Sequence, residues 1–513
     1  MTRIAERFHF WLCLGGISMY RKANKDQFFI ESFFLPFGGK LDSNNRWVKL
    51  AEITPWEKIE EYYLKSMNAD QGREAISARI AFGAISLRKS ESLSDEDTVR
   101  YIQENPYVQY YLGLHEFHPE PLFDSSMMVH FRKRFPVEFI AKVNECIATG
   151  KWPEENRDID RNDKNDGTGS GGSGDHDEAE EQGDEKNSGT LILDATVAPA
   201  DIKYPTDIDL LNKCREYLEN AIRRIWSYVP HESQKHMLPY NRRNARRAFL
   251  DIAKSKKWTK KKLHEGIGTQ LDYIEKATKR LEELQKLFPE WEKRLPKWLL
   301  DRLAVVPMVC AQQKEMYDCG THYCENRIVS FEQPHVRPIV RGKRPEPTEF
   351  GQKIHLSVVN GYAFIEQTSW DNFNEGTDLR SAVEEYRRRF GCYPDAVLAD
   401  RIYQTKSNRK YCKTKHIRLS GPKLGRPPED AEKLQDNQKQ MYQDACERNI
   451  VEGKNGTAKR RYGLNLIMSK LSETSKTDAA LAIMMMNAWK RVCEILLRYL
   501  FGFPDFYLLL SAQ

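Results

Sequence analysis

The order of strand and helix signals in the second half of the chain limits the possible folds most. In chain order, the expected elements are strands at 353–361 and 362–370, a helix at 378–390, and strands at 395–400 and 416–421. The first two strands meet at Asn360-Gly361, a dipeptide that strongly favours a two-residue hairpin. Because strands and a helix are interleaved in this order, the sequence predicts a mixed α/β sheet.

A further strand and a large helical insertion are expected upstream of this region. LILDATVA (191–198) is an apolar run that carries one acid, and long helical patterns follow it between 210 and 303. Lys and Arg residues cluster at 242–262 within the insertion. A basic run is usually a solvated helix face, so by itself this cluster only weakly favours an anionic partner.

A flexible linker at 151–189 is expected to separate an N-terminal unit from everything downstream. It contains GTGSGGSG followed by DHDEAEEQGDEKNSG, a composition that cannot bury apolar surface. Upstream, residues 29–150 carry helical patterns, including a capping signature that begins at Ser94 and apolar spacing from Phe131 to Cys146. The sequence therefore predicts an all-helical N-terminal domain before the α/β region.

The composition is typical of a cytoplasmic protein with an anionic partner. The ten Cys residues are scattered, which favours reduced thiols over a disulfide scaffold. The net charge of +6 hides an acidic linker among basic stretches, and nucleic acid is the commonest partner of such surfaces. Residues 1–28 form an N-terminal extension whose apolar run, 8–19, is shorter than the roughly 20 residues that span a bilayer. A start at Met19 would make residues 1–18 an upstream addition.

Two acids lie on strands that are otherwise apolar. Asp194 is in LILDAT, and Asp400 ends DAVLAD. Burying an unpaired carboxylate costs several kcal/mol, about 2–7 for a polar group and more for a charge, so a cation is an obvious compensating partner. Sites in open α/β sheets form at the carboxyl ends of strands, where Asp400 would lie. The alternative is that each Asp caps a turn or a helix.

A third acid lies on the charged helix expected at 436–461, upstream of an apolar helix at 479–500. In RNIVEGKNGTAKRRYGL, helical spacing puts Arg448, Glu452 and Lys459 broadly on one side. A Glu between two basic groups can bind a metal while Arg and Lys hold phosphate. Any charged helix could provide this arrangement, so the pattern is weak by itself.

Together, these segments resemble the DDE transposases of the IS-four/IS-five superfamily, and in particular the IS-five-type branch of bacterial insertion-sequence enzymes. The helix resembles the R-x3-E-x6-K part of the family signature. DATVAPADIKYPTDIDLLN, RIVSFEQPHVRPIVRGK, EFGQKIHLSVVNGYAF, ADRIYQTKSNRKYC and GPKLGRP are similar to further stretches of that branch. Residues 29–135 resemble its N-terminal transposase domain, so the similarity runs over nearly the whole chain.

The resemblance implies a ribonuclease H-like catalytic core at 190–475, interrupted by a basic helical insertion at about 208–320 and followed by a C-terminal helix at 476–513. It also implies that Asp194, Asp400 and Glu452 are the catalytic acids and the metal ligands. Asp201 and Asp207 compete for the first role, but they follow the apolar strand. The family's Tyr, three residues before the Arg, falls on Ala445, and the nearest tyrosine is Tyr442.

The chemistry that the resemblance implies is phosphoryl transfer with two Mg²⁺ or Mn²⁺ ions about 3.5–4 Å apart. Such ions activate a water or a 3′-hydroxyl, and no covalent enzyme intermediate is needed. The glycine-rich linker lacks the Gly-Lys-Ser/Thr ending of a phosphate-binding loop, so no nucleotide cofactor is expected. A structural zinc site at Cys310, Cys319, His322 and Cys324 is a weak alternative, because the spacing does not match a zinc finger.

The partner is then double-stranded DNA, both the inverted-repeat ends of the element and the target. The predicted DNA contacts are Arg448, Lys459, Arg460, Arg242, Arg243, Arg246, Lys256, Lys257, Arg132 and Arg134. We expect the N-terminal domain to recognise the ends, a homodimer to pair them, and the protein to lie in the bacterial cytoplasm, with no membrane contact. The alternatives are a descendant that binds DNA without cutting it, and a general nuclease that joins nothing.

Overall fold

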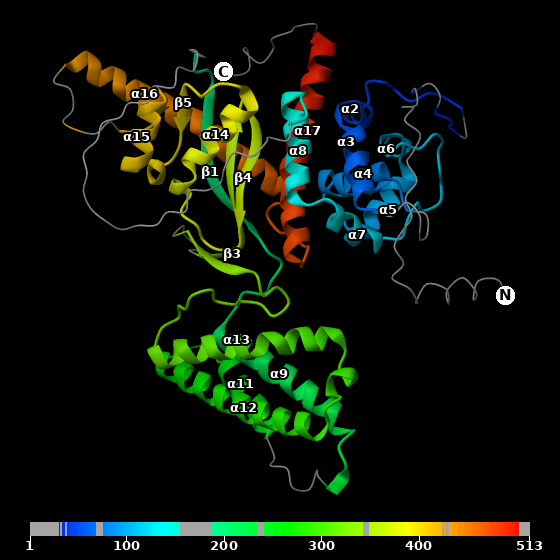
Figure 1. The fold of residues 1–513 in the computed structure, drawn as a ribbon, viewed down its shortest axis with the longest axis vertical. Helices are drawn as coiled ribbons and strands as arrows, with labels where there is room; N and C mark the ends of the chain where they lie inside the picture. Colours follow the sequence, from blue (N-terminus) through cyan, green and yellow to red (C-terminus); the bar gives the residue numbers. More distant parts are fainter. Residues whose placement is uncertain are drawn as a thin grey trace.

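The computed structural model describes residues 30, 33–35, 38–67, 75–153, 186–232, 241–255, 257, 259–341, 348–422, 425 and 430–501. The N-terminal extension at 1–28 and the Gly/Ser-rich and acidic part of the linker therefore lie outside the described residues, as does Lys256. Within them the chain forms a mixed α/β structure with a helical N-terminal region, as the sequence predicts (Figure 1).

A six-stranded mixed sheet forms the centre of the molecule, in the order β2-β3-β1-β5-β6, with β4 also pairing with β3. The strands are β1 (Thr190–Pro199), β2 (Arg337–Val340), β3 (Thr348–Val359), β4 (Tyr362–Ser369), β5 (Ala396–Leu398) and β6 (Arg418–Leu419). Strand β1 runs antiparallel to β3 and parallel to β5, and β5 runs parallel to β6. The central position of β1 explains its nearly continuous apolar sequence, because both of its faces are covered.

The hairpin expected at Asn360-Gly361 is present. Both residues have positive φ, 52° and 74°, as a two-residue hairpin loop requires, and they connect β3 directly to β4. Strand β3 begins earlier than expected, at Thr348, because its first residues pair with β2. The sequence analysis did not identify β2, a short strand whose pairing partner lies outside its own segment.

Short helices connect the second half of the sheet, and a long one crosses it. The connectors are η4 (Glu375–Thr377), α14 (Leu379–Phe390), η5 (Arg401–Tyr403) and α15 (Lys406–Thr414). The long helix, α16 (Ala431–Arg461), contacts β1 and β5. Helix α14 ends at Gly391, whose φ of 82° is the left-handed conformation common after a helix.

The N-terminal helices are not a separate unit. They are α2 (Arg46–Ile53), α3 (Trp56–Lys65), α4 (Ala78–Ser90), α5 (Asp95–Glu104), α6 (Pro106–Tyr111), α7 (Met127–Arg134) and α8 (Val137–Thr149). They share one hydrophobic core with one face of the sheet and with the C-terminal helix α17 (Ser472–Phe501). As expected, Ser94 caps α5, its side chain accepting a hydrogen bond from the amide of Asp97.

Helix α17 joins the N-terminal helices to the α/β region in one hydrophobic core. All eight side chains from Ala479 to Met486 are buried, so this helix is covered all round rather than on one face. It packs along α8 between the N-terminal helices and β4 (Figure 1). No helix in the described part of the chain, α17 included, is long and apolar enough to span a membrane.

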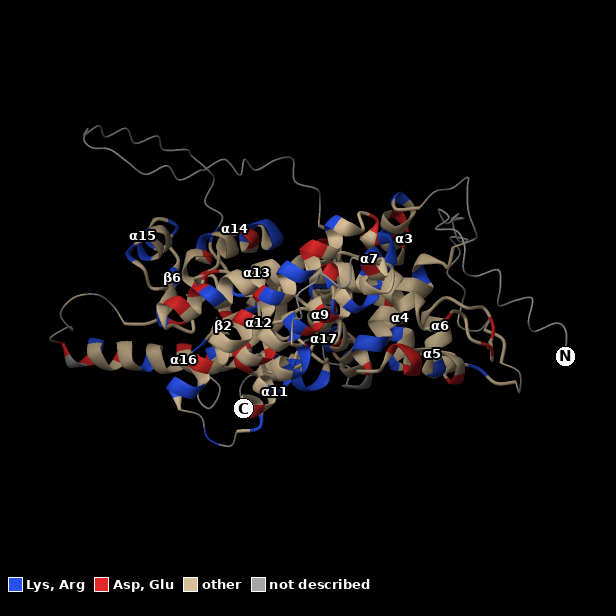
Figure 2. Ribbon diagram, turned by 90° about the horizontal axis from the view of Figure 1, so that it is seen from below, with Lys and Arg blue, Asp and Glu red and all other residues tan. Residues whose placement is uncertain are grey.

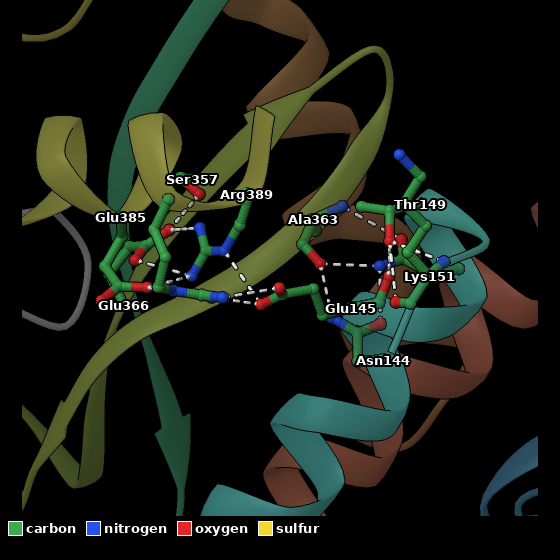
Figure 3. A network of polar contacts seen from close by, with 11 residues as sticks. Asn144, Glu145, Thr149, Lys151, Ser357, Ala363, Glu366, Glu385 and Arg389 are labelled. Carbon is green, nitrogen blue, oxygen red and sulfur yellow. Dashed lines mark hydrogen bonds and ion pairs between the residues drawn. The ribbon is translucent and has the colours of Figure 1, made fainter. Parts of the chain in front are cut away.

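Buried polar contacts also fasten α8 to the sheet (Figure 3). The amide of Asn144 donates to the carbonyl of Ala363 on β4 at 3.0 Å. Beside it, Glu145 forms ion pairs with Arg388 and Arg389 of α14, and Arg389 also pairs with Glu366 of β4. Such a network holds the N-terminal helices in one orientation against the α/β region.

The helical insertion has a core of its own. It comprises α9 (Asp207–Trp226), α11 (Arg242–Ala253), α12 (Lys260–Leu287), the short η3 (Trp291–Arg294) and α13 (Lys297–Cys319). The bundle stands apart from the sheet at one end of the molecule (Figure 1). The two ends of the insertion lie close together. Asp207 at the start of α9 forms an ion pair of 2.6 Å with Arg327, which follows α13.

Candidate active site

Two of the predicted acids lie at the same level on neighbouring parallel strands. Asp194 is the fifth residue of β1, and Asp400 follows the end of β5 by two residues. The pairing of the two strands aligns Ile192 with Leu398, so the same register carried on by two residues aligns Asp194 with Asp400. The carboxyl end of β5 is therefore the edge of the sheet at which both acids can meet.

Helix α16 presents four polar side chains along one face. They recur at intervals of four, three and four residues, the spacing of neighbours on a helix surface. They are Arg448, Glu452, Asn455 and Lys459. All four line an open cleft of about 1050 Å³ that is also lined by Asp194 and Asp400. The structure thus brings the three predicted acids and two predicted basic residues to one cleft.

Two contacts tie α16 to the acids of the sheet. Arg448 forms an ion pair with Asp400, whose side chain is 58% exposed. The amide nitrogen of Asn455 donates to Oδ2 of Asp194 at 2.9 Å. Glu452, one turn before Asn455, is exposed to solvent within the cleft. The helix therefore holds its own acid opposite the two acids of the sheet.

The environment of Asp194 raises the pKa of its carboxyl group. Burial raises the pKa of this carboxyl group, and the nearby carboxylates Asp400 and Glu375 raise it further. The backbone amide of Ala195 and the charge of Arg341 act in the opposite direction and only partly offset the rise in pKa. Carboxylates that raise one another's pKa in this way form a site where an added cation would be stabilised.

Sequence reasoning missed several polar residues of the cleft, among them Glu375, Lys353 and Asn455. Glu375 lines the cleft and pairs with Lys353, whose Nζ lies 2.7 Å from its Oε1. Asn455 could have been found, because it lies three residues after Glu452 on a helix. Glu375, in contrast, lies in a connecting segment with no periodic pattern, so only the tertiary structure reveals it.

The cleft offers oxygen donors of the kind that Mg²⁺ and Mn²⁺ prefer. Within the described ranges, no three His, Cys, Asp or Glu side chains stand close enough to hold one metal ion. Close to Asp194, however, the Oδ1 atom of Asn455 is buried and has no hydrogen-bond partner in the described part of the chain. The donors fit a divalent cation in kind, and Arg448 competes with such a cation for Asp400.

Comparison with protein families decides what this cleft belongs to. Residues 397–488 match the model "Transposase DDE domain", and this match includes Asp400 and Glu452. Residues 36–134, from before α2 to the end of α7, match "Transposase domain (DUF772)". This chain belongs to the insertion-sequence DDE transposases. The IS-five-type branch remains an inference from the sequence.

A curated relative of the transposase covers only part of the chain. An uncharacterized protein of Rhizobium meliloti, ORF8 in the nfe locus, is 36% identical over 108 residues. The match covers 20% of the transposase and 52% of that protein, so the chain spans about half the length of the relative. No solved structure matches the transposase.

Two of the predicted DNA contacts, Arg132 and Arg134, are engaged in contacts within the N-terminal region. Arg132 is buried, and its guanidinium group donates two hydrogen bonds of 2.8 Å to Asp95 on α5. Arg134 is half-buried and lies over the ring of Tyr63. Arg132 thus contacts α5 and Arg134 contacts α3, from different sides of α7. Only Lys133 between them is exposed.

The predicted contacts in the insertion and on α16 are more accessible. Arg243 and Arg246 of α11 are exposed, and so is Lys257. Arg242 is exposed but pairs with Glu219 at 3.0 Å. On α16, Arg460 is exposed and lies next to Lys459 at the cleft. None of these positions has been tested for DNA contact, so their role stays a prediction.

The residues considered as alternatives in the sequence, Asp207 for the first acid and Tyr442 for the family's tyrosine, lie outside the cleft. Asp207 pairs with Arg327 and with His322 at the root of the insertion, and it does not line the cleft. Tyr442 has a side chain that is 73% exposed and is likewise not part of the cleft lining. Of the cysteines considered for zinc, Cys310 lies beside Cys214, which lowers the pKa of its thiol.

Proposed function

We propose that the transposase binds the terminal inverted repeats of its own element, cuts the DNA there and joins the freed 3′ ends to target DNA. The observation that carries this proposal is the cleft itself. Asp194 and Asp400 lie at one level on adjacent parallel strands, and Glu452 faces them from the crossing helix. Basic side chains from the same helix lie on the same wall.

A ribonuclease H-like core is the fold we propose for the α/β region. Its support is the arrangement around β1, which has the β3–β4 hairpin on one side and the parallel strand β5, reached through α14, on the other. The helical insertion lies between β1 and β2 in the chain and has its own hydrophobic core. This connectivity leaves the acid-bearing edge of the sheet accessible.

In the proposed reaction, the chain's own residues bind and orient the DNA. Asp194, Asp400, Glu452 and the neighbouring amide of Asn455 would hold two divalent cations. When bound, those cations supply the activation of the attacking oxygen and the stabilisation of the leaving oxygen. Arg448 and Lys459 would neutralise the scissile phosphate, Arg448 as a planar donor and Lys459 as a point charge.

The Asp400–Arg448 ion pair suggests an order of events at the site. In the structure, Arg448 neutralises Asp400. Arg448 would leave Asp400 when that carboxylate holds a cation and would then contact a DNA phosphate, so the same guanidinium group would serve first the acid and then the substrate. We further propose that two copies act together to pair the element's ends, in the bacterial cytoplasm.

The experiment that tests this function uses a labelled duplex with the element's end and adjoining host DNA. Cleavage and strand transfer are measured with Mg²⁺, with Mn²⁺ and with EDTA. We expect metal-dependent products from the wild type and at least a 100-fold loss of rate in Glu452→Gln, since one oxygen donor is removed. The matched control is Glu447→Gln, an exposed glutamate on the same helix outside the cleft.

Each other outcome has a defined meaning. Wild-type protein that binds the end but never cuts it would overturn the catalytic proposal in favour of a DNA-binding descendant. Equal cleavage of DNA that lacks the repeats, without joining, would replace transposition by a general nuclease activity. Retained activity in Glu452→Gln would remove this residue from the site.

A further inference from the structure

We propose that the outer face of α15 binds the phosphate backbone of the duplex that occupies the cleft, through Lys406, Lys410 and Lys413. This inference rests on the proposed function, because it supplies a DNA contact to the same site. It names a surface outside the contacts that the sequence analysis selected. The partner it fits is duplex DNA of any sequence.

The composition of this segment is unusual within a chain of nearly balanced charge. From residue 401 to residue 428 the sequence contains nine Lys and Arg and no Asp or Glu. Helix α15 carries four of the nine, and Lys and Arg colour its ribbon in Figure 2. A run of this length without an acid has no local means of neutralising its charge.

Exposure separates the two faces of α15. The inner face is held by Asn408, whose amide donates to the carbonyls of Gly376 and Tyr403 at 2.6 and 2.8 Å, and by the buried Cys412. The three lysines are exposed and spaced by four and three residues, so they form one stripe on the outer face. The helix is therefore fixed against the body while its lysines face solvent.

The lysines of the stripe lack the acidic partners that basic residues have elsewhere. In the described part of the chain, none of the three is in an ion pair, whereas Arg388 and Arg389 on the adjacent α14 pair with Glu145. The acid nearest to α15 by contact, Glu384, accepts a hydrogen bond from Tyr411 at 2.6 Å instead. An ordinary solvated helix face usually interleaves both signs of charge, so this stripe is better matched to an anionic partner.

The position of the stripe connects it to the cleft. Asp400 is followed directly by η5, where Arg401 and Ile402 are exposed and line the cleft. Helix α15 begins at Lys406, six residues after Asp400. From Lys406 to Lys413 the helix rises by about 10 Å. That length corresponds to about three phosphate steps along one strand of a duplex. The stripe therefore begins close to the cleft along the chain and matches about three phosphate steps in length.

Lysine is suited to a contact that does not read sequence. Its ammonium group is a point charge on a flexible stem, which follows a backbone phosphate without selecting a base. The stripe should thus add the same affinity to element ends and to target DNA. Its contribution should fall steeply with salt, because each neutralised phosphate releases counterions.

The test compares a triple variant, Lys406→Gln, Lys410→Gln and Lys413→Gln, with the full-length wild type. The matched control is Lys286→Gln, Lys293→Gln and Lys297→Gln, three exposed lysines of the insertion outside the cleft. Binding is measured by fluorescence anisotropy between 50 and 300 mM salt, on an element-end duplex and on a random duplex of equal length. Circular dichroism checks the fold of each variant. A second triple variant, Lys406→Arg, Lys410→Arg and Lys413→Arg, tests whether positive charge alone restores binding.

We expect the α15 triple to lower the slope of log K against log salt by about two to three, since each lost phosphate contact removes about 0.9. The control should leave the slope unchanged, and the arginine triple should restore it. A loss on both duplexes supports the proposal, and a loss on only one of them contradicts a contact that does not read sequence. A slope equal to that of the binding-competent wild type would overturn it. A wild type that binds neither duplex would instead contradict the proposed function.

Discussion

At the scale of single residues, the cleft is surrounded by polar atoms that tertiary packing leaves without partners. Among the described residues these include Oδ1 of Asn455 and the hydroxyl of Tyr403. An unsatisfied buried polar atom costs about 1–3 kcal/mol. Such a cost is tolerated at functional sites, so the unpartnered Oδ1 of Asn455 beside Asp194 agrees with the cleft as the place of chemistry.

Asn455 should act as a positioning residue for Asp194. Replacing it with Leu keeps the volume but removes the donor to Oδ2 of Asp194, so the carboxylate loses its fixed orientation. We expect the single-turnover cleavage rate to fall by about 10–100-fold and Mn²⁺ affinity to weaken by a similar factor. DNA binding should not change. Asn449→Leu, at an exposed position on the same helix, is the control.

His335 provides a prediction about pH. Its ring contacts Trp370 with 4.4 Å between centroids, and burial lowers its pKa to about 4, with Arg337 and Lys476 acting in the same direction. In the unfolded chain the pKa is about 6.5. The unfolded state therefore binds more protons between these two values, and stability falls as the pH drops from about 6.5 to about 4.

We expect His335→Gln to remove part of this acid sensitivity. The effect should be on the order of 1 kcal/mol, because solvent screens a partly exposed ring. Urea unfolding at pH 7.5 and at pH 4.5 would measure the difference between the two proteins. If both lose the same stability on acidification, His335 does not contribute.

At the scale of elements, α8 is joined to α14 and β4 by charge as well as by apolar packing. Arg389 lies between Glu145 and Glu366, and all three side chains are at most 10% exposed. A buried network of this kind gives little net stability, but it is strongly destabilised when one partner is removed. It therefore determines the orientation of α8 more than it increases the stability of the fold.

Breaking this network should be costly. Glu145→Gln leaves Arg388 and Arg389 without a carboxylate on α8, and we expect the free energy of unfolding to fall by about 3 kcal/mol. Guanidinium titration followed by circular dichroism would measure it. Glu61→Gln, which breaks an exposed pair with Lys58, should cost less than about 1 kcal/mol. Equal effects of the two substitutions would show that the network is not a buried one in solution.

At the scale of the whole molecule, two hydrophobic cores differ in how they depend on the rest of the chain. The insertion buries its own apolar residues and is rooted at one place, near Asp207 and Arg327. The N-terminal helices instead need α17, which arrives from the opposite end of the chain. The insertion is thus a removable unit, and the N-terminal helices are not.

Replacing residues 208–320 with a short Gly/Ser linker should leave the remaining fold intact. We expect scanning calorimetry to lose one of two transitions while the other keeps its midpoint, because the cores are separate. Truncation after residue 471, which deletes α17, should abolish cooperative unfolding of the N-terminal helices. Retention of that transition in the truncated protein would contradict the shared core.

The sequence by itself determined the features that depend on neighbours along the chain. The Asn360-Gly361 hairpin, the capping of α5 by Ser94 and the helical spacing of Arg448, Glu452 and Lys459 were predicted because each is a local property of the backbone. The placement of Asp194 and Asp400 on apolar strands also predicted that they would need compensation. Their meeting at one edge depends on the pairing of β1 with β5, which the tertiary structure shows.

Only the tertiary structure decided what depends on distant partners. It buried Arg132 against Asp95, brought Glu375 to the cleft, and placed α17 inside the N-terminal core. These outcomes arise from contacts between segments tens to hundreds of residues apart. No local periodicity encodes such pairings, because a side chain's burial and charge environment depend on which surfaces the whole chain brings together.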